Sequence, residues 1–359
     1  MTSRERVVKA MRREKPDRIP FDFPNGFAPA VMEVFRKHTG LDDPYDYFGA
    51  DVRYVGEGGT KYPNDYSEYH PNLPPTAWVD EWGIGHLPTK STEKGHSHLE
   101  GFLYPMLNLR TKEDILNYPL PDVEAEYRYE HLPAQVRALH DKGVCVTGCL
   151  ACTFYEIAWY MRSMELLLMD FVDNQEFAEI LLDRILEKRI VQAKFLVESG
   201  IDILQLGDDI ASQRGMMMRM SMWRKWFKSR METVIQTARK VNPDILIFYH
   251  SDGDCTEAIP DLIEIGVDIL NPVQAECMDG PKLKKLYGER LSFWGTIGTQ
   301  TTLPFGTPED VRREVKVRME TMGRGGGLCL GPTHMVEPDV TWENLTAFVD
   351  AVKEYGRYS

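Results

Sequence analysis

Two histidines and one aspartate have the residue types and the placement of a divalent-metal site. His250 and Asp252 leave one apolar run two residues apart, and His334 follows another such run near the end of the chain. Residues i and i+2 can turn toward one point where the backbone bends, and the glycine after Asp252 permits such a bend. Imidazole nitrogen and carboxylate oxygen are ligands of Zn²⁺ and similar ions. In the alternative interpretation, His250 is a hydrogen-bonded core histidine and Asp252 caps a helix that begins near residue 256.

Other side chains that could take part in chemistry also follow apolar runs. Glu276 and Cys277 lie in a neighbouring segment, and either of them could complete the ligand set. Cys145, Cys149, Cys152 and Cys255 lack the paired spacing of a zinc finger and are expected to be structural. The residues at the ends of the apolar runs are Asp22, Gly148, Cys149, Asp208, Asp209, His250, Asp252, Gln274, Glu276, Cys277, Gly295, Thr296 and His334.

The elements that would position these side chains alternate between apolar runs and amphipathic stretches. The runs are rich in Val, Ile and Leu without strict alternation, which is typical of strands buried on both faces of a parallel sheet. Expected strands are 18–23, 52–55, 144–150, 202–208, 245–251, 269–274, 292–297 and 327–332. Expected helices are 3–14, 153–168, 173–199, 222–240, 256–265, 279–287, 308–322 and 342–354.

Repeated βα units predict an α/β fold, and we favour a (β/α)8 TIM barrel over a doubly wound open sheet. In such a barrel the active site lies at the carboxyl ends of the strands, where the residues named above converge. We expect one domain over 1–359. The alternation of apolar runs and amphipathic stretches is absent over 57–141. This segment is rich in Tyr, Trp, Pro and His, so we predict an irregular insertion that acts as a lid.

Composition limits the classes of partner. The chain has 359 residues, and 42 Lys plus Arg against 55 Asp plus Glu give a formal net charge of −13. A protein this acidic is a poor ligand for nucleic acid or an anionic membrane surface. The first residues lack the apolar core of a secretory signal, no apolar run reaches membrane-spanning length, and six cysteines are too few for a disulfide scaffold. We therefore expect a cytoplasmic protein.

Three local patterns receive weaker interpretations. The methionines between Met216 and Met222 indicate packing in the core or at a subunit interface, which would make a homodimer, and a flexible wall for a bulky substrate is the alternative. His96-x-His98 lies in a polar loop and is expected to be solvated. Gly325–Gly327 precedes a strand rather than a helix, so it does not indicate a dinucleotide site.

Several longer motifs resemble the uroporphyrinogen decarboxylase superfamily. They are Thr2-Ser3-Arg4-Glu5-Arg6-Val7 through Pro16-Asp17-Arg18-Ile19-Pro20, Tyr249-His250-Ser251-Asp252-Gly253 continuing to Gln274, and Gly331-Pro332-Thr333-His334 through Pro338-Asp339. The resemblance spans essentially the whole chain and implies the (β/α)8 fold. The superfamily contains porphyrinogen decarboxylases and zinc-dependent methyltransferases that work with corrinoid proteins.

Two departures from the family patterns narrow the expected function. The decarboxylases bind a tetra-acid substrate with an arginine-rich loop after the first strand, whereas residues 24–29 here contain no arginine. The thiol-directed methyltransferases carry a His-x-Cys pair and a distant Cys as zinc ligands, and this sequence has His250, Asp252 and His334 at those positions. A nitrogen and oxygen ligand set makes zinc a stronger Lewis acid, better suited to an ether or phenolate oxygen than to a thiolate.

The resemblance therefore implies a zinc-dependent methyltransferase that moves a methyl group from a methyl ether, preferably a methoxylated aromatic, to a Co(I) corrinoid. No Asp-x-His-x-x-Gly corrinoid signature occurs, so the corrinoid is expected on a separate partner protein. The metal ligands would be His250, Asp252 and His334, with Cys277 as a further ligand. Glu276 or Asp209 would orient the small-molecule donor or supply a proton. The expected substrate-binding residues are Asp22, Phe23, Met216 and Gln274.

Three alternatives remain at this stage. The first is a metal-independent decarboxylase of a small acid that uses Asp22, Asp209 and His334 as acid–base groups. The second is a methyltransferase that delivers methyl from a corrinoid to a thiol or folate, which the missing cysteine ligands disfavour. The third is a binding protein without catalysis.

Overall fold

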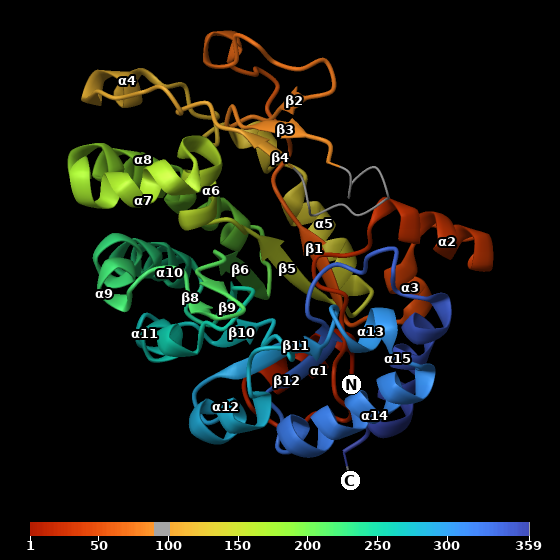
Figure 1. Cartoon of the computed structure of the whole chain (residues 1–359). Coiled ribbons are helices and arrows are strands. Elements are labelled where there is room, and N and C mark those ends of the chain that lie inside the picture. Colours follow the sequence, from red (N-terminus) through yellow and green to blue (C-terminus); the bar gives the residue numbers. More distant parts are fainter. Residues whose placement is uncertain (90–100, 359) are drawn as a thin grey trace.

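Seven parallel strands and one shorter segment form a closed ring in the computed structural model, which describes residues 1–89 and 101–358 (Figure 1). Neighbouring strands pair in the order β1-β5-β6-β9-β10-β11-β12. Their bounds are β1 (Val52–Val55), β5 (Cys145–Cys149), β6 (Ile203–Gly207), β9 (Leu246–His250), β10 (Ile269–Asn271), β11 (Ser292–Ile297) and β12 (Leu328–Pro332). The eighth position belongs to the segment around Phe21. The Asp22 amide donates to the Leu330 carbonyl of β12 (2.9 Å), and the Asp51 amide donates to the Phe21 carbonyl (3.0 Å).

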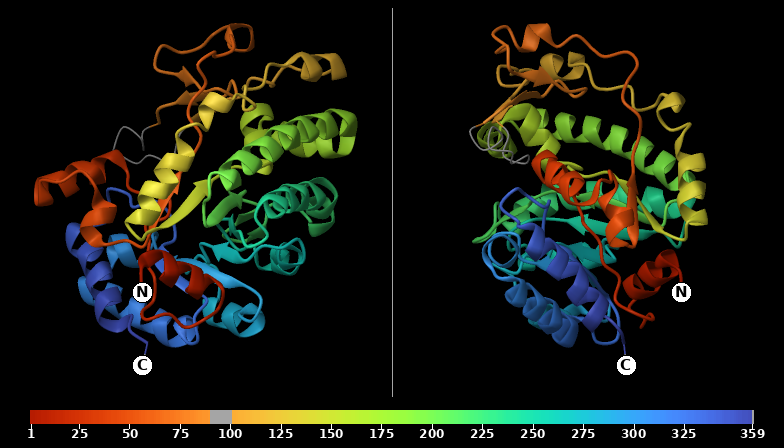
Figure 2. Two further views of the ribbon diagram at one scale, coloured as in Figure 1. Left: turned by 180° about the vertical axis from the view of Figure 1, so that it is seen from behind. Right: turned by 90° about the vertical axis from the view of Figure 1, so that its right-hand side faces the viewer.

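This ring is a (β/α)8 barrel, which confirms the predicted fold class. Each expected strand is present near its predicted position, but the segment 18–23 is reduced to a single parallel bridge between Phe21 and Leu330. Helices surround the strands in all three views, and both chain termini lie at one end of the barrel (Figures 1 and 2). The bond from the Ile19 amide to the Gly356 carbonyl (2.8 Å) joins these terminal segments.

The helices follow most of the expected positions, with changes at their ends. The stretch expected at 153–168 is two helices that meet at Ser163, whose φ of 74° interrupts the first of them. The α-helices are α1 (Ser3–Met11), α2 (Pro29–Thr39), α3 (Pro44–Phe48), α4 (Lys112–Asn117), α5 (Leu132–Asp141), α6 (Tyr155–Arg162), α7 (Met164–Asp173), α8 (Gln175–Glu198), α9 (Met220–Trp223), α10 (Ser229–Val241), α11 (Ile259–Glu264), α12 (Gly280–Tyr287), α13 (Thr302–Phe305), α14 (Pro308–Arg318) and α15 (Trp342–Tyr355). Single π-turns at Arg224–Lys228 and Met319–Gly323 follow α9 and α14, and 3₁₀ turns lie at Ser67–Tyr69, Glu126–Arg128 and Thr256–Ala258.

The inside of the barrel is filled by apolar side chains from alternate strand positions, closed at the amino ends of the strands by α1. Val7, Ala10 and Met11 of α1 belong to the same buried cluster as Cys145 and Trp294 of the strands. A second and larger cluster lies between the strands and the outer helices. Because both faces of each strand are buried, the strand sequences are nearly continuous apolar runs.

The segment 57–141 is more regular than its composition suggested. It contains a small antiparallel sheet of β2 (Trp78–Val79), β3 (Gly85–Leu87) and β4 (Gly101–Leu103), which lies next to α6 (Figure 2). The helix α5 packs on β1 and β5 and is therefore a helix of the barrel, which corrects the prediction that the whole segment is irregular. His96 and His98 lie outside the described residues.

Within the residues that the structure describes, no helix is long and apolar enough to cross a membrane.

Candidate metal centre at the barrel mouth

His250 is the last residue of β9, and the neighbouring strand fixes its ring. Its Nδ1 lies 2.5 Å from Oδ1 of Asn271, the last residue of β10, with which His250 is in register. The Asn271 amide group in turn donates to the Trp294 carbonyl of β11 (3.3 Å). His250 and Asn271 are both buried, so this network holds the imidazole with its other nitrogen, Nε2, directed away from Asn271.

Two carboxylates lie on the Nε2 side of His250. Asp252 Oδ1 is 3.8 Å from Nε2 and Asp209 Oδ1 is 3.6 Å from it. Both distances are longer than the donor–acceptor distance of a hydrogen bond and leave space between the oxygen atoms and the ring nitrogen. The Asp252 amide donates to Asp209 Oδ1 (2.8 Å), which joins the loops after β6 and β9.

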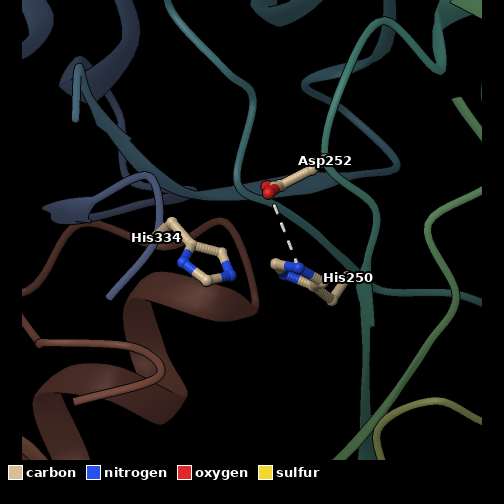
Figure 3. A group of neighbouring side chains, drawn as sticks. All are labelled: His250, Asp252 and His334. Carbon is tan, nitrogen blue, oxygen red and sulfur yellow. Dashed lines mark ion pairs between the residues drawn. The ribbon is translucent and has the colours of Figure 1, made fainter. Parts of the chain in front are cut away.

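His334 comes from the loop after β12 and completes a group of three possible ligands. One ligand atom each from His250, Asp252 and His334 lies within 4.8 Å of the other two. Figure 3 shows the two imidazole rings and the carboxylate pointing toward one shared space, with ring centres of the histidines 6.1 Å apart. The structure thus brings together the three residues that the sequence singled out as metal ligands.

The spacing and chemistry of this group fit a zinc ion. Zinc ligands at about 2.1 Å from the ion stand about 3.4 Å apart in a tetrahedron, whereas His250 Nε2 and Asp252 Oδ1 are 3.8 Å apart and all three donor atoms lie within 4.8 Å of one another. Small side-chain rotations would bring all three donor atoms to that spacing. Three protein ligands and one open position are also the arrangement of catalytic rather than structural zinc sites.

The charges around the centre favour a cation. Burial lowers the pKa of His250, but the nearby carboxylates of Asp252 and Asp209 outweigh burial and raise it overall. Burial, followed by the charges of Asp209 and Asp208, raises the pKa of Glu156 to about 8. Burial also raises the pKa of Asp208 to about 7. These shifts describe a buried region with an excess of acidic groups, which a positive ion would stabilise.

A pocket of about 290 Å³ opens beside Asp252 and His334. Asp252, Gln274 and His334 contribute to its polar wall, and Phe305 and Met335 contribute apolar surface. Phe305 is the last residue of α13 and is 75% exposed, so its ring faces open space rather than the core. The pocket therefore combines two of the possible metal ligands with an aromatic side chain.

The other predicted residues of the β10 loop have mainly anchoring contacts. Gln274 Oε1 accepts from the Gly253 amide (2.9 Å) and supports the turn after β9. Glu276 Oε1 accepts from the Gln300 amide (3.0 Å) and the Thr301 hydroxyl (3.1 Å), which ties it to the loop after β11. The Cys277 thiol lies 3.8 Å from the Gln274 carbonyl, and burial, with Asp254 and Glu276, raises its pKa to about 11. Cys277 is not one of the three residues of the metal-binding group.

Three predicted substrate-binding residues do not line the pocket beside the metal-binding group. Asp22 is fully buried and accepts a hydrogen bond from the Tyr54 hydroxyl (2.5 Å). Phe23 is buried in an aromatic cluster with Phe21, Phe48 and others, so we correct its assignment from substrate contact to core packing. Met216 lies in the short hairpin of β7 (Ala211–Ser212) and β8 (Gly215–Met216) and packs against the core.

Sequence reasoning missed Asn271, Glu156 and Phe305. Asn271 is part of the run Asn271-Pro272-Val273-Gln274, but a strand-end amide gives no signal of which neighbour it contacts. Glu156 lies in the first turn of α6, where its Oε2 accepts from the Asp209 amide (3.0 Å). Phe305 is an exposed aromatic residue in a short helix, and only the three-dimensional arrangement places it beside the metal-binding group.

A family comparison decides the membership of the chain. The model of the uroporphyrinogen decarboxylase (URO-D) family matches residues 104–355. The chain belongs to the uroporphyrinogen decarboxylase family. This confirms the resemblance seen in the motifs.

Two kinds of curated relative are similar to this member of the family. Methylcobamide:CoM methyltransferase MtaA of Methanosarcina barkeri is 27% identical over 184 residues, which are 51% of this chain and 51% of the relative. Uroporphyrinogen decarboxylase of Hydrogenobaculum sp. (strain Y04AAS1) is 24% identical over 187 residues, which are 52% and 51% of the two chains. The chain thus matches about half the length of these relatives.

Among solved structures, a methyltransferase from Methanosarcina mazei shares the fold. It superposes with a TM-score of 0.69 at 17% identity and covers 99% of both chains. This likeness supports the barrel architecture over the whole length of the chain.

Proposed function

We propose that this protein is a corrinoid-dependent methyltransferase that removes a methyl group from a methyl ether, with a methoxylated aromatic compound as donor. The observation that carries the proposal is the group of two imidazoles and one carboxylate at the barrel mouth, in a family whose members include corrinoid methyltransferases. The methyl group would pass to Co(I) of a corrinoid on a separate protein, because the chain contains no corrinoid-binding signature.

In this proposal, His250, Asp252 and His334 hold a zinc ion. When bound, zinc supplies a Lewis acid for the ether oxygen that leaves as a phenolate. The displacement breaks the bond between the methyl carbon and this oxygen and forms a bond between the carbon and cobalt, and the electron pair of the broken bond stays on oxygen. The phenol that corresponds to this leaving group has a pKa near 10, so the phenolate is basic and its developing negative charge must be stabilised for the reaction to proceed at neutral pH.

The remaining residues of the mouth orient and enclose the donor. Phe305 and Met335 offer an apolar wall for an aromatic ring. Gln274 supports the turn that carries Asp252, and Asp209 supports the same turn from the β6 side. Glu276 fixes the loop that precedes α13 and thereby the position of Phe305. The described parts of the insertion before α5, residues 57–89 and 101–131, would serve as the lid over this mouth.

The absence of a thiolate ligand from the group favours an oxygen leaving group. Thiolates donate charge to zinc, whereas the nitrogen and oxygen donors of this site leave it a stronger Lewis acid. The opposite direction, transfer from a methylated corrinoid to a thiol, is the second candidate because the methyltransferase relative is named for that reaction with CoM. The two candidates differ in whether the donor is an ether or the corrinoid itself.

The experiment mixes the zinc-loaded chain with a reduced corrinoid protein and a panel of methoxyarenes, and follows methyl–cobalt formation by its absorbance. We expect formation only with an ether donor. An Asp252→Cys variant replaces the carboxylate with a soft thiolate ligand. It should bind zinc but transfer methyl from ethers at least about 10-fold more slowly than the wild type. Transfer only from methylcobalamin to thiols would establish the second candidate, and decarboxylation of a small acid without metal would replace both.

A further inference from the structure

The buried side chain of Asn271 contacts the imidazole of His250. The Asn271 Oδ1 atom and the His250 Nδ1 atom are 2.5 Å apart, and the backbone of the two residues is also connected, since the Ser251 amide donates to the Asn271 carbonyl (2.9 Å). Asn271 is 1% exposed, so water does not compete for these bonds.

The second contact of Asn271 determines which way its amide group faces. Its Nδ2 atom donates to the main-chain carbonyl of Trp294 (3.3 Å). A carbonyl oxygen only accepts hydrogen bonds, so the group facing Trp294 must be the NH₂ and the group facing His250 must be the oxygen. An amide oxygen also only accepts, and His250 Nδ1 must therefore carry the proton of the shared hydrogen bond.

This reasoning fixes the state of the second ring nitrogen. In a neutral imidazole only one nitrogen carries a proton, so with Nδ1 protonated the Nε2 atom has a lone pair. Nε2 is the atom that faces Asp209 and Asp252 at 3.6 Å and 3.8 Å. A lone pair directed at the space between the carboxylates and His334 is what a metal ligand needs.

We propose that Asn271 is a positioning residue that holds His250 as the Nδ1–H tautomer and directs its Nε2 lone pair into the metal-binding group. The inference rests on the metal site of the proposed function, but not on the identity of the methyl donor or on the corrinoid. In this proposal Asn271 is not itself a ligand of the ion and acts only through His250. A purely structural asparagine would need the bond to Trp294 but would have no effect on the tautomer of His250.

The tautomer is measured on the metal-free wild-type chain by histidine ¹⁵N NMR, at an alkaline pH where the imidazole is neutral. The His250 signals are assigned by comparison with a His250→Ala variant. We expect the Nδ1–H form in the wild type and, in an Asn271→Leu variant, a shift toward the Nε2–H form that free histidine prefers in water. A wild-type His250 in the Nε2–H form would overturn the proposal.

Zinc affinity, measured by competition with a chelating dye, is the second readout. Asn271→Leu should weaken zinc binding about 10- to 100-fold, the usual effect of losing the hydrogen-bond partner of a ligating histidine. Asn271→Asp keeps an oxygen acceptor toward Nδ1 and should retain the affinity within about threefold. An Asn271→Leu variant that is folded and binds zinc as tightly as the wild type would contradict the proposal.

A matched control separates this effect from a general loss of stability. Gln192 of α8 is also a buried amide, and it accepts from Arg189 (2.9 Å) and donates to Glu57 (2.5 Å). Gln192→Leu should lower the melting temperature but leave zinc affinity unchanged. A dependence of zinc affinity on Asn271 without any methyl transfer would support this inference and contradict the proposed function. A wild-type chain that binds no zinc would contradict both.

Discussion

Two groups of charged side chains at opposite ends of the barrel use carboxylates in opposite ways. At the amino ends of the strands, the buried Asp51 accepts from Arg6 (2.8 Å), from two nitrogen atoms of Arg18 (both 2.8 Å) and from the Phe21 amide (3.0 Å). At the carboxyl ends, Asp252 is 3.8 Å from His250, beyond hydrogen-bonding distance. Two arginines of the chain neutralise the first carboxylate, and the second belongs to a group of side chains that could hold a metal ion.

The difference distinguishes an acid that stabilises the fold from one that can act on a ligand. Asp51 joins the first segment of the barrel to β1 through Phe21 and Arg18, so its charge is used in closing the ring. Asp252 stands beside an imidazole whose orientation is fixed by Asn271. We expect substitutions in the first group to change stability and substitutions in the second to change metal binding and catalysis.

The largest expected effect belongs to His250→Ala. Removal of one of three ligands should abolish stoichiometric zinc binding and lower methyl transfer more than about 1,000-fold, because the stabilisation of the leaving oxygen is lost. Zinc content is measured by elemental analysis and transfer by methyl–cobalt absorbance. Full activity in this variant would show that methyl transfer does not depend on a metal ion held by His250.

The matched change in the opposite group is Asp51→Ala. It leaves two guanidinium groups without their shared carboxylate, one of them buried, and should lower the free energy of unfolding by about 3 kcal/mol. Zinc affinity of the folded fraction should equal that of the wild type. Urea unfolding measures the stability and dye competition measures the zinc affinity. A loss of zinc affinity with unchanged stability would contradict the assignment of Asp51 to the stability of the fold.

A smaller effect concerns Asp22, an acid paired with Tyr54 rather than with a cation. Burial raises its pKa from 3.8 to about 7, so the folded state holds this proton more tightly than the unfolded state. The corresponding stability is fully present below pH 4 and is lost as the pH rises through 7. Between pH 5 and pH 8 the free energy of unfolding of the wild type should therefore fall by about 2 to 3 kcal/mol relative to that of an Asp22→Asn variant.

Unfolding curves of both proteins at the two pH values test this prediction. Only the difference between the proteins is used, so that other buried acids such as Asp208 and Glu156 cancel. An equal stability difference at pH 5 and pH 8 would show that Asp22 does not titrate in this range.

The smallest expected effect belongs to Phe305→Ala. The ring is 75% exposed, so stability should be unchanged, whereas the KM for a methoxyarene should rise about fivefold through the loss of about 1 kcal/mol of aromatic contact. Steady-state kinetics provide the test. A lower melting temperature with an unchanged KM would reassign Phe305 to the fold.

The sequence predicted the barrel, and from the barrel it predicted that His250, Asp252 and His334 lie close together. The second prediction has a simple physical reason. The carboxyl ends of parallel strands lie at one end of the barrel, so polar residues that follow such strands converge without further information. The same reasoning was wrong for Phe23, which is buried in an aromatic cluster, because a residue at a strand end can face the outer helices as readily as the mouth. It also missed α5, whose helical pattern is embedded in a segment with an unusual composition.

The roles of Asn271 and Glu156 could not be predicted, because each depends on contacts between neighbouring strands and loops. Asn271 is defined by its register with His250 and by the Trp294 carbonyl of the next strand. Glu156 is defined by the loop after β6, which is 53 residues away in sequence. Such contacts depend on side-chain directions that periodicity does not specify.

X-ray absorption at the zinc edge of the purified, zinc-loaded chain tests the central claim most directly, because it reports which elements surround the ion. The account predicts one zinc per chain with nitrogen and oxygen neighbours at about 2.0–2.2 Å and the signature of two imidazoles. A sulphur neighbour at about 2.3 Å, or a folded chain that takes up no zinc, would contradict it.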